Sequence, residues 1–560
     1  MAEHEGGPLG GTDPYDREAQ IFPELDDDQI ARVAAFGTTE TVEEGTWLFR
    51  RGERSADFFV IENGSIEISG GAAEAGEEVV TVHGRRQFTG ELDLFNDRAI
   101  LVSGRAGPSC RIVRVLHKDF RRMIEAESDI GEIVMRAFIL RRVGLMRHSQ
   151  GGVLLIGSAH CADTLRIQRF LSRNGYPHRM LDVESDPDAQ VTLRSFDLPA
   201  DEYPVVIIPG SDRLRNPRTP ALADALGLTE RIDPDEAFDL AVIGAGPAGL
   251  AAAVYGASEG LRTIVIEGMA PGGQAGTSSR IENYLGFPTG ISGQALAGRA
   301  QVQAQKFGAK LAISRCATGI ACNSTPYEIG MEDGIKVSAR AIVIATGARY
   351  RTLDVENYER YEGQGIHYAA TWIEGNLCSN EEVIVVGGGN SAGQAAVFLS
   401  QHARHVHIMV RSGGLAATMS DYLIQRIDAS PRITLHTRTE ITGLAGEPFL
   451  KEVTWTNRES GEAETRRIAN VFVMIGAIPN TDWLDGCVKL DRGGFVITGK
   501  DSEGMALSSP YATERPGIFA VGDVRAGSTK RVASGVGEGS VVVQAVHAWL
   551  AEQADHSSPA

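Results

Sequence analysis

Two glycine-rich turns are the segments of this 560-residue chain whose residue types and spacing best suit chemistry. The first, GAGPAG at residues 244–249, follows the apolar run Leu240–Ile243. Its first glycine permits a tight turn, its second lets a pyrophosphate approach the backbone, and its third lets a helix pack closely on a sheet. Glu267 ends the next apolar run, where a carboxylate can accept hydrogen bonds from a ribose. The spacing predicts a dinucleotide-binding site.

The second turn, GGGNSA at residues 387–392, follows the apolar run Val383–Val386. Ala392 is small enough to take the packing role of the third glycine. The next apolar run, Val406–Val410, ends at Arg411 instead of an acid. A guanidinium there suits a ribose 2′-phosphate, so NADPH is favoured over NADH. The alternative is that Arg411 is a solvated charge at the end of a strand.

Composition narrows the classes of function. At roughly 150 residues per domain, the length predicts three or four domains. Lys and Arg number 54 against 73 Asp and Glu, for a net charge of −19, and an acidic surface disfavours nucleic acid as a partner. The six cysteines are scattered without a C-x-x-C pair, so neither a disulfide framework nor a metal site is predicted. The first residues are unlike a signal peptide, and Pro247 with several glycines interrupts the longest uncharged stretch. We therefore expect a cytoplasmic protein without a membrane span.

Periodicity divides the chain into units. Residues 1–20 predict an acidic, solvated tail. Residues 21–148 predict a small antiparallel roll followed by helices, and residues 149–232 predict a strand–helix–strand unit with a further strand and a closing helix. From Phe238 to about Glu552, strands and helices alternate, which predicts doubly wound parallel sheets. The predicted fold class is multidomain α/β with a β-rich unit at the N-terminus.

The order of motifs along residues 238–552 resembles the thioredoxin reductase family. The motifs are GAGPAG at 244–249, GGQ at 272–274, IENYLGFP at 281–288, ATG at 345–347, GGGNSA at 387–392 and GD at 522–523. The resemblance implies two Rossmann-like domains and a homodimer. The FAD domain would comprise residues 233–351 and 475–560, and the NADPH domain would be inserted at residues 352–474.

The resemblance also assigns roles to residues. The first turn, Glu267, Gln274 and Asn283 would contact FAD, and Asp523 with residues 530–533 would hold its ribityl chain and flavin ring. The second turn and Arg411 would bind NADPH. The candidate cofactor-binding residues are Gly244, Gly246, Pro247, Ala248, Gly249, Glu267, Gly273, Gln274, Asn283, Ala345, Thr346, Gly347, Gly387, Gly389, Asn390, Ser391, Ala392, Arg411, Gly522, Asp523, Arg531, Val532 and Ala533.

The sequence departs from this family at the redox-active pair of cysteines. Where the family carries C-x-x-C, this chain reads AATW at residues 369–372. Without thiols, reduced flavin cannot pass electrons to an internal disulfide by thiol exchange. Nearby Cys378 has no partner in sequence and is interpreted as inert. Trp372 is either a stacking lid over the flavin or a core tryptophan.

Residues 149–232 resemble a glutaredoxin or thioredoxin-like fold. Tyr203-Pro204 occupies the place of the cis-proline in that fold, and the thiol loop, residues 158–164, keeps only Cys161. A thiol beside His160 at a helix N-terminus is suited to a lowered pKa. Two interpretations stay open: a monothiol that passes electrons, or a redox-inactive spacer.

Residues 21–148 resemble the cyclic-nucleotide-binding domain of bacterial regulators. Residues 88–95 match its phosphate cassette, and Gly90, Glu91 and Leu92 match the G-E-L triplet, whose Glu binds ribose in that family. The arginine that clamps the cyclic phosphate is replaced by Leu101, and the available arginines are Arg98 and Arg105. The unit is either a cyclic-nucleotide site or a degenerate regulatory or dimerising domain.

The function predicted from these observations is an NAD(P)H-dependent FAD oxidoreductase of the thioredoxin-reductase type. Hydride would pass from NADPH to FAD, and the electrons would leave to an acceptor other than an internal dithiol: a small molecule, Cys161 or a partner protein. Cys161 and Trp372 are the candidate catalytic residues. The alternatives are a sensor flavoprotein with little turnover and a disulfide reductase that acts through Cys161.

Overall fold

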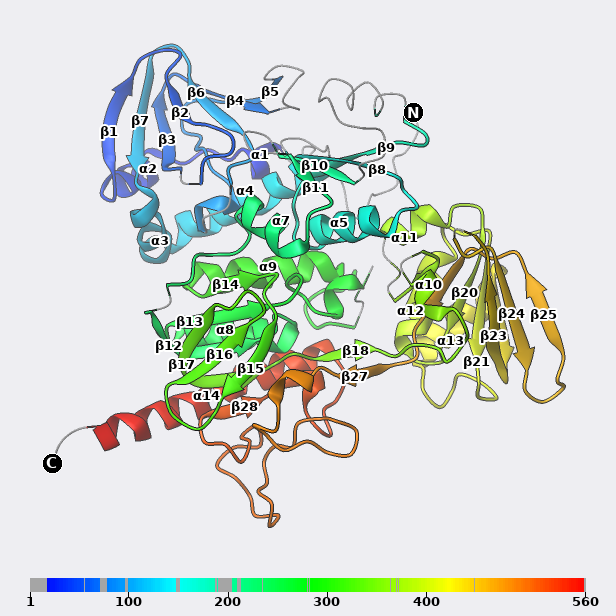
Figure 1. Cartoon of the computed structure of the whole chain (residues 1–560). Coiled ribbons are helices and arrows are strands. Elements are labelled where there is room, and N and C mark those ends of the chain that lie inside the picture. Colours follow the sequence, from blue (N-terminus) through cyan, green and yellow to red (C-terminus); the bar gives the residue numbers. More distant parts are fainter. Residues whose placement is uncertain are drawn as a thin grey trace.

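The computed structural model places the chain in four packed units (Figure 1). It describes residues 18–557 apart from residues 55, 71–77, 96–98, 148–151, 187, 188, 190–203, 209–212, 234, 279, 280, 282, 363, 369, 371 and 448. Most of the predicted acidic tail, together with Arg98, Tyr203, Ala369 and Thr371, lies outside the described residues.

The N-terminal unit holds two antiparallel sheets and four helices. One sheet has the order β1-β7-β3, with β1 (Thr38–Val42), β7 (Cys110–Val115) and β3 (Phe58–Asn63). The other has the order β2-β6-β4-β5, with β2 (Trp47–Phe49), β6 (Ser103–Ala106), β4 (Ile66–Gly70) and β5 (Glu78–His83). The helices are α1 (Glu18–Ile21), α2 (Asp27–Ala34), α3 (His117–Ala126) and α4 (Ser128–Arg147). Rings of Phe58, Phe88, Phe120 and Phe138 fill the core between sheet and helices, so the predicted β-rich unit is present.

The middle unit is a mixed four-stranded sheet in the order β11-β10-β8-β9. Its elements are β8 (Val153–Gly157), α5 (Ala162–Arg173), β9 (His178–Asp182), β10 (Val205–Ile207), β11 (Leu214–Arg215) and α7 (Thr219–Leu226). β8 and β9 are parallel, whereas β10 runs antiparallel to both β8 and β11.

The first dinucleotide unit is built on the sheet β14-β13-β12-β17-β16-β15, with β28 also beside β17. The strands are β12 (Ala237–Ile243), β13 (Thr263–Glu267), β14 (Lys310–Ile313), β15 (Ala317–Ala321), β16 (Tyr327–Met331), β17 (Lys336–Ile344) and β28 (Ile518–Ala520). Strands β12, β13, β14, β17 and β28 are parallel, as predicted. β15 and β16 are antiparallel, because short turns join them to each other and to β17, without the helix that a parallel crossover requires.

The second dinucleotide unit is inserted into the first. Its parallel sheet has the order β19-β26-β20-β21-β22, with β19 (Ile366–His367), β26 (Asn470–Val473), β20 (Glu382–Val386), β21 (His405–Val410) and β22 (Ile433–Thr437). Beside it lies an antiparallel sheet of β23 (Thr439–Ala445), β24 (Glu452–Asn457) and β25 (Ala463–Arg466). Its helices are α10 (Tyr358–Tyr361), α11 (Trp372–Leu377), α12 (Asn390–Leu399) and α13 (Asp421–Ala429). The chain enters and leaves through the paired strands β18 (Ala348–Tyr350) and β27 (Ala477–Pro479).

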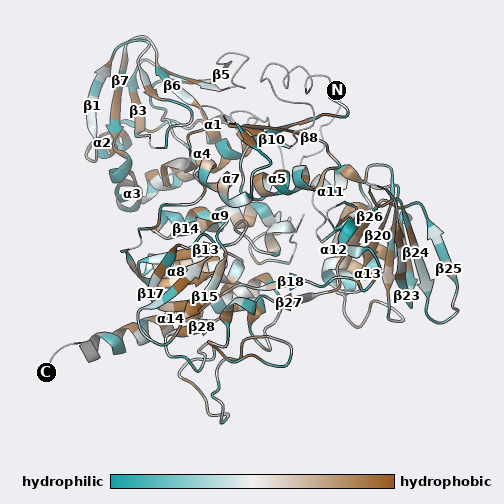
Figure 2. Cartoon of the chain, in the orientation of Figure 1, coloured by the Kyte–Doolittle hydropathy of each residue, from teal (hydrophilic) through white to brown (hydrophobic). Residues whose placement is uncertain are grey.

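Apolar residues concentrate in the central strands and in the helices that cover them (Figure 2). In the first dinucleotide unit, α8 (Pro247–Ser258) and α14 (Val532–Ser557) pack against one face of the sheet, and α9 (Gly293–Lys306) packs beside α8. In the part of the chain that the structure describes, no helix combines the length and apolarity needed to cross a bilayer.

Helices α8 and α14 approach so closely that a side chain is excluded at their contact. A Cβ at Gly539 of α14 would lie 2.1 Å from the carbonyl oxygen of Ala248 in α8. At Gly537, two residues earlier, a Cβ would meet no atom within 4 Å.

We therefore expect Gly539→Ala to destabilise the protein by about 1–3 kcal/mol, because the added methyl must push two helices apart. Gly537→Ala is the matched control, and should stabilise by about 0.5–1 kcal/mol because alanine is the better helix former. Thermal unfolding of the FAD-loaded protein measures both. Equal melting temperatures for the two variants would contradict the close contact.

Candidate functional site

The first glycine turn joins three backbone segments. A Cβ at Gly249 would lie 1.8 Å from the carbonyl oxygen of Gly244, and one at Gly244 would lie 2.4 Å from the carbonyl oxygen of Ala345. Pro247 is the first residue of α8, so the open N–H groups of the first helical turn face outward from the end of β12. This arrangement forms a cradle for a pyrophosphate.

The loop at residues 272–274 closes the side of this cradle. A Cβ at Gly273 would lie 3.0 Å from Cα of Gly246, so only a glycine allows the two turns to adjoin. Gln274 Nε2 donates a hydrogen bond to the carbonyl oxygen of Ala348 at 2.5 Å. Glu267 stands at the end of β13, where one carboxylate oxygen accepts from Ala245 N at 2.8 Å and the other from Met269 N at 2.9 Å. Asn283 is exposed.

The C-terminal segment covers the same cradle. A Cβ at Gly522 would lie 2.9 Å from Cβ of Ala248, and Gly522 N donates to Glu538 of α14 at 2.7 Å. Burial raises the pKa of the neighbouring Asp523, and Lys530 opposes that shift. No described residue donates a hydrogen bond to the Asp523 carboxylate. Arg531 directly precedes α14, and Val532 and Ala533 are the first two residues of that helix.

The segment Ala345-Thr346-Gly347 is tied to the end of the inserted unit. Thr346 Oγ1 donates to the carbonyl oxygen of Asn480 at 2.8 Å, and Asn480 Nδ2 donates back to the carbonyl oxygen of Thr346 at 2.9 Å. This reciprocal pair lies beside β18 and β27, so it fixes the entry to the second dinucleotide unit where that unit joins the first.

The second glycine turn repeats the geometry of the first. A Cβ at Gly387 would lie 2.2 Å from the carbonyl oxygen of Met474, whereas one at Gly389, the cap of α12, would meet nothing within 4 Å. Asn390 Oδ1 accepts from Ser420 N at 2.7 Å, and Thr418 Oγ1 donates to the carbonyl oxygen of Gly388 at 2.7 Å. Ala392 is fully buried and Ser391 is exposed. The open side of Gly389 and the start of α12 suit a second pyrophosphate.

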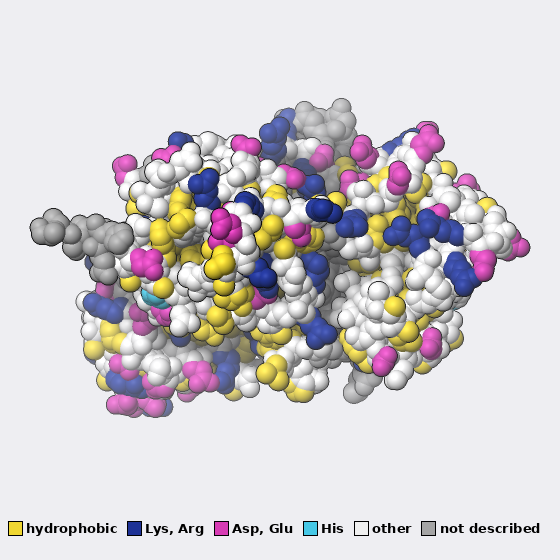
Figure 3. Space-filling model, turned by 90° about the horizontal axis from the view of Figure 1, so that it is seen from below, with side chains coloured by type: hydrophobic (Ala, Val, Ile, Leu, Met, Phe, Trp, Pro, Cys, Tyr) yellow, Lys and Arg dark blue, Asp and Glu magenta, His cyan; other side chains and the backbone are white. Residues whose placement is uncertain are grey.

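Arg411 is exposed directly after β21, at the same edge of the sheet as this turn. Lys and Arg side chains also gather over this unit in the view from below (Figure 3). A cation at this place suits a 2′-phosphate. The residues present therefore fit both an FAD and an NADPH.

The cysteines are not arranged as a redox pair beside the cradle. All six lie in the described part of the chain and are free thiols. Cys378 is fully buried, and burial raises the pKa of its thiol. Cys322 and Cys487 lie next to each other in the core under the sheet, where burial and this neighbour raise the pKa of Cys487 to about 12. Trp372, the first residue of α11, is 40% exposed.

The middle unit contacts both dinucleotide units through α5. Arg173 donates to the carbonyl oxygen of Gly273, in the first cradle, at 3.0 Å. Arg169 donates to Glu374 of α11 at 3.1 Å, and the side chain of Glu374 is only 4% exposed. Cys161 caps the other end of α5 and is partly exposed, and the ring of His160 packs against Phe449, with centroids 5.5 Å apart. Helix α5 thus spans the junction of the two units (Figure 1).

Sequence reasoning missed several residues that shape the site. Arg173, Asn480 and Glu538 hold the cradle through their side chains. Nothing in their local sequence marks them, because their partners lie 100, 134 and 16 positions away in sequence. The adjacency of Cys322 and Cys487 was likewise not predicted.

Comparisons with known proteins agree with this geometry. The family described as Pyridine nucleotide-disulphide oxidoreductase matches residues 238–541, and the Cyclic nucleotide-binding domain family matches residues 39–127. A thioredoxin reductase of Mycolicibacterium smegmatis is 33% identical over 317 residues, which cover 56% of this chain and 97% of that protein. A NADH dehydrogenase of Bacillus subtilis is 29% identical over 315 residues, covering 56% and 59%. The solved thioredoxin reductase of Lactococcus lactis (FR conformation) is 30% identical, covers 56% of this chain and 99% of that chain, and superposes with a TM-score of 0.52.

Fold, cradles and matches together define an FAD-dependent NAD(P)H oxidoreductase. The chain belongs to the pyridine nucleotide-disulphide oxidoreductase family. In this chain, a thioredoxin reductase-like flavoprotein is fused to a cyclic-nucleotide-binding domain.

The contact of Arg173 with the FAD cradle leads to a prediction. We expect Arg173→Ala to weaken FAD binding about tenfold, because a charge-assisted hydrogen bond that fixes Gly273 is lost. Arg166→Ala is the matched control: it lies on the same helix, but its guanidinium binds Pro217 O and Asn216 within the middle unit. FAD release after dilution measures the affinity. An Arg173→Ala protein that retains FAD as tightly as Arg166→Ala would contradict this role.

Proposed function

We propose that the protein transfers hydride from NADPH to FAD and delivers the electrons to an acceptor other than an internal dithiol. The observation that carries this proposal is the residue content of the segment before β20. In the sequence, Ala369 and Trp372 stand where the family carries its two cysteines, and Cys378, the nearest thiol in sequence, is buried in the core.

The residues of the two cradles support the cofactor assignment. FAD, when bound, accepts a hydride from NADPH and passes two electrons on. The glycines of the first turn let the backbone approach its pyrophosphate, and Glu267, already oriented by backbone N–H groups, stands where a ribose would lie. Asp523 is half-buried, and no described residue donates a hydrogen bond to its carboxylate, so it is available to the hydroxyl groups of the ribityl chain.

Trp372 is proposed to limit access to the flavin. It begins α11, whose Glu374 is held by Arg169 of the middle unit, and its ring is partly exposed. An indole at this position would exclude water from one face of a planar ring and leave room for a small acceptor.

A second candidate function is disulfide reduction through Cys161. The strand order of the middle unit supports a glutaredoxin-like interpretation, and Cys161 caps the helix that contacts both dinucleotide units. In this route the Cys161 thiolate attacks a substrate disulfide, releases one thiol and forms a mixed disulfide. A second thiol must then attack the sulfur of Cys161 in the mixed disulfide, which releases the second substrate thiol and forms a disulfide with Cys161. Two electrons from the flavin and two protons would return this disulfide to thiols.

The name of the Bacillus subtilis relative points to acceptors other than disulfides, since that protein is a NADH dehydrogenase. The predicted homodimer and cytoplasmic location stay predictions.

An anaerobic titration tests the proposal. NADPH should bleach the visible band of bound flavin with one equivalent per chain, and a quinone should restore it. A flavin that stays oxidised in excess NADPH would refute the proposal.

Arg411 should decide the choice of coenzyme. We expect Arg411→Ala to raise the KM for NADPH about ten- to a hundredfold and to leave the KM for NADH nearly unchanged, because only NADPH carries the 2′-phosphate. Arg404→Ala, an exposed arginine just before the opposite end of β21, is the matched control. Steady-state kinetics with both coenzymes provide the measurement. Equal losses for NADPH and NADH would show that Arg411 does not contact the 2′-phosphate.

Cys161→Ser separates the two routes. If the electrons leave without a dithiol, NADPH-dependent reduction of a quinone and of an aryl disulfide should both persist in the variant. Loss of aryl-disulfide reduction alone, with quinone reduction intact, would instead establish the Cys161 route.

A further inference from the structure

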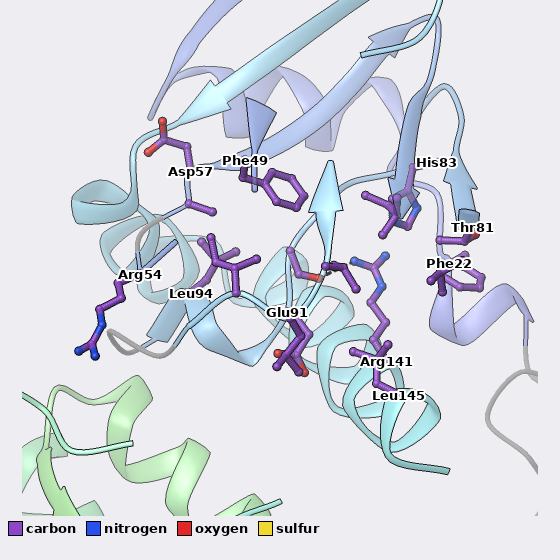
Figure 4. A pocket seen from close by; sticks show the side chains of 17 residues that line it. Phe22, Phe49, Arg54, Asp57, Thr81, His83, Glu91, Leu94, Arg141 and Leu145 are labelled. Carbon is purple, nitrogen blue, oxygen red and sulfur yellow. Dashed lines mark hydrogen bonds between the residues drawn. The ribbon is translucent and has the colours of Figure 1, made fainter. Parts of the chain in front are cut away.

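The N-terminal unit contains a cavity between its β-sheet and α4 (Figure 4). Most of the side chains that line it are apolar, among them Phe22, Phe49, Leu94, Ile100, Leu101 and Leu145. Glu91 of the G-E-L triplet also lines it, so this is the place where a cyclic nucleotide would lie. The lining can therefore be tested against such a ligand.

The carboxylate of Glu91 is already committed. Both of its oxygens accept from the guanidinium of Arg142, through Nε and Nη2, and both side chains are buried, at 12% and 7% exposure. A ribose hydroxyl would have to share the carboxylate with this ion pair, using its remaining lone pairs, because separating the two charges would leave each of them desolvated.

Among the described residues that line the cavity, no cation is placed for a cyclic phosphate, and Arg98 lies outside the described residues. Leu101 occupies the position of the clamp arginine, and both Leu101 and the preceding Ile100 are buried apolar lining residues. Arg105 points elsewhere: it pairs with Glu67 at 3.4 Å and lies over the ring of Trp47. Arg54, at the edge of the cavity, is exposed and donates to the carbonyl oxygen of Asp224 at 2.6 Å. A phosphate anion would thus be buried against aliphatic side chains.

The remaining cation, Arg141, is used by the fold. Its Nε, Nη1 and Nη2 donate to the carbonyl oxygens of Ile21, Gly90 and Phe88 at 2.9–3.1 Å, and its guanidinium lies 4.9 Å from the centroid of the Phe88 ring. These bonds fix the cassette to α1 and α4.

His83 supplies the one hydrogen-bonding group in the lining that is buried without a partner. It is 3% exposed, and its Nδ1 has no hydrogen-bond partner among the described residues. Burial and the nearby Arg141 hold its pKa well below the usual range, so the imidazole is neutral. In Figure 4, His83 lies with Arg141 and Phe22 along one side of the cavity.

We propose that this cavity binds a neutral, mostly apolar molecule with a hydroxyl group that pairs with His83 Nδ1, and that it does not bind a cyclic nucleotide. A hydroxyl suits either tautomer of the ring, because it can donate to Nδ1 or accept from it. Transfer of the molecule's apolar surface from water into the apolar cavity supplies most of the binding free energy.

Isothermal titration of the full-length, FAD-loaded protein with 2-naphthol, naphthalene, cyclic AMP and cyclic GMP tests this proposal. We expect one 2-naphthol per chain, bound about tenfold more tightly than naphthalene, which lacks the hydroxyl. The two cyclic nucleotides should give no binding at concentrations that saturate 2-naphthol.

Variants of β5 assign the site. His83→Phe should weaken 2-naphthol about tenfold and leave naphthalene unchanged, whereas His83→Gln, which keeps a hydrogen-bonding group, should retain most of the affinity. Val82→Thr is the matched control, since Val82 is 51% exposed on the same strand. If His83→Phe fails to fold, the comparison of 2-naphthol with naphthalene in the wild-type protein still tests whether the hydroxyl group contributes to binding. The proposal is overturned by a cyclic nucleotide that binds more tightly than 2-naphthol, by absent 2-naphthol binding, or by equal affinities in wild type and a folded His83→Phe.

Discussion

The close approach of backbone to backbone at the first glycine turn is the constraint on which the reductase portion depends. The carbonyl of Gly244 sits where a side chain at Gly249 would be, and the carbonyl of Ala345 sits where one at Gly244 would be. Because no methyl group fits, helix α8 can start directly against the sheet, and its first turn faces the cradle. Helix α14 then packs on α8 through Ala248, which brings Gly522 and Asp523 to the same place.

Helix α5 extends this constraint beyond the two dinucleotide units. Its Arg173 holds the loop that completes the first cradle, and its Arg169 holds Glu374 in the second dinucleotide unit. His367 receives the other contact of Arg169, at 3.1 Å, and burial, reinforced by Arg169, lowers the pKa of its ring. A neutral imidazole with an accepting Nδ1 is consistent with Nε2 donating to Asn470. If the inserted unit moves, it must therefore either break these contacts or move together with α5.

Much of the fold could be predicted from the sequence, because its signals are local. The predicted strand–helix–strand unit with its closing helix is present, as α5 between β8 and β9 and as α7, and both glycine turns follow the strands expected. The antiparallel hairpin of β15 and β16 was not predicted, since short apolar runs look alike in parallel and antiparallel sheets. Site residues that act through long-range contacts could not be predicted from local sequence. Arg173 and Gly273, for example, are a hundred positions apart. The ion pair between Glu91 and Arg142 could not be predicted for the same reason, because the two residues are far apart in sequence.

The N-terminal and middle units do not have separate interiors where they meet. Leu101 and Leu145 from the first are packed in one apolar cluster with Leu155 and Phe170 from the second. Arg51 and Arg142 add hydrogen bonds to the carbonyl oxygens of Gly152 and Gly175 across the same boundary. A chain cut between α4 and β8 would expose both halves of this cluster to water and invite aggregation. The two units accordingly form one folding block, and neither is an independent module.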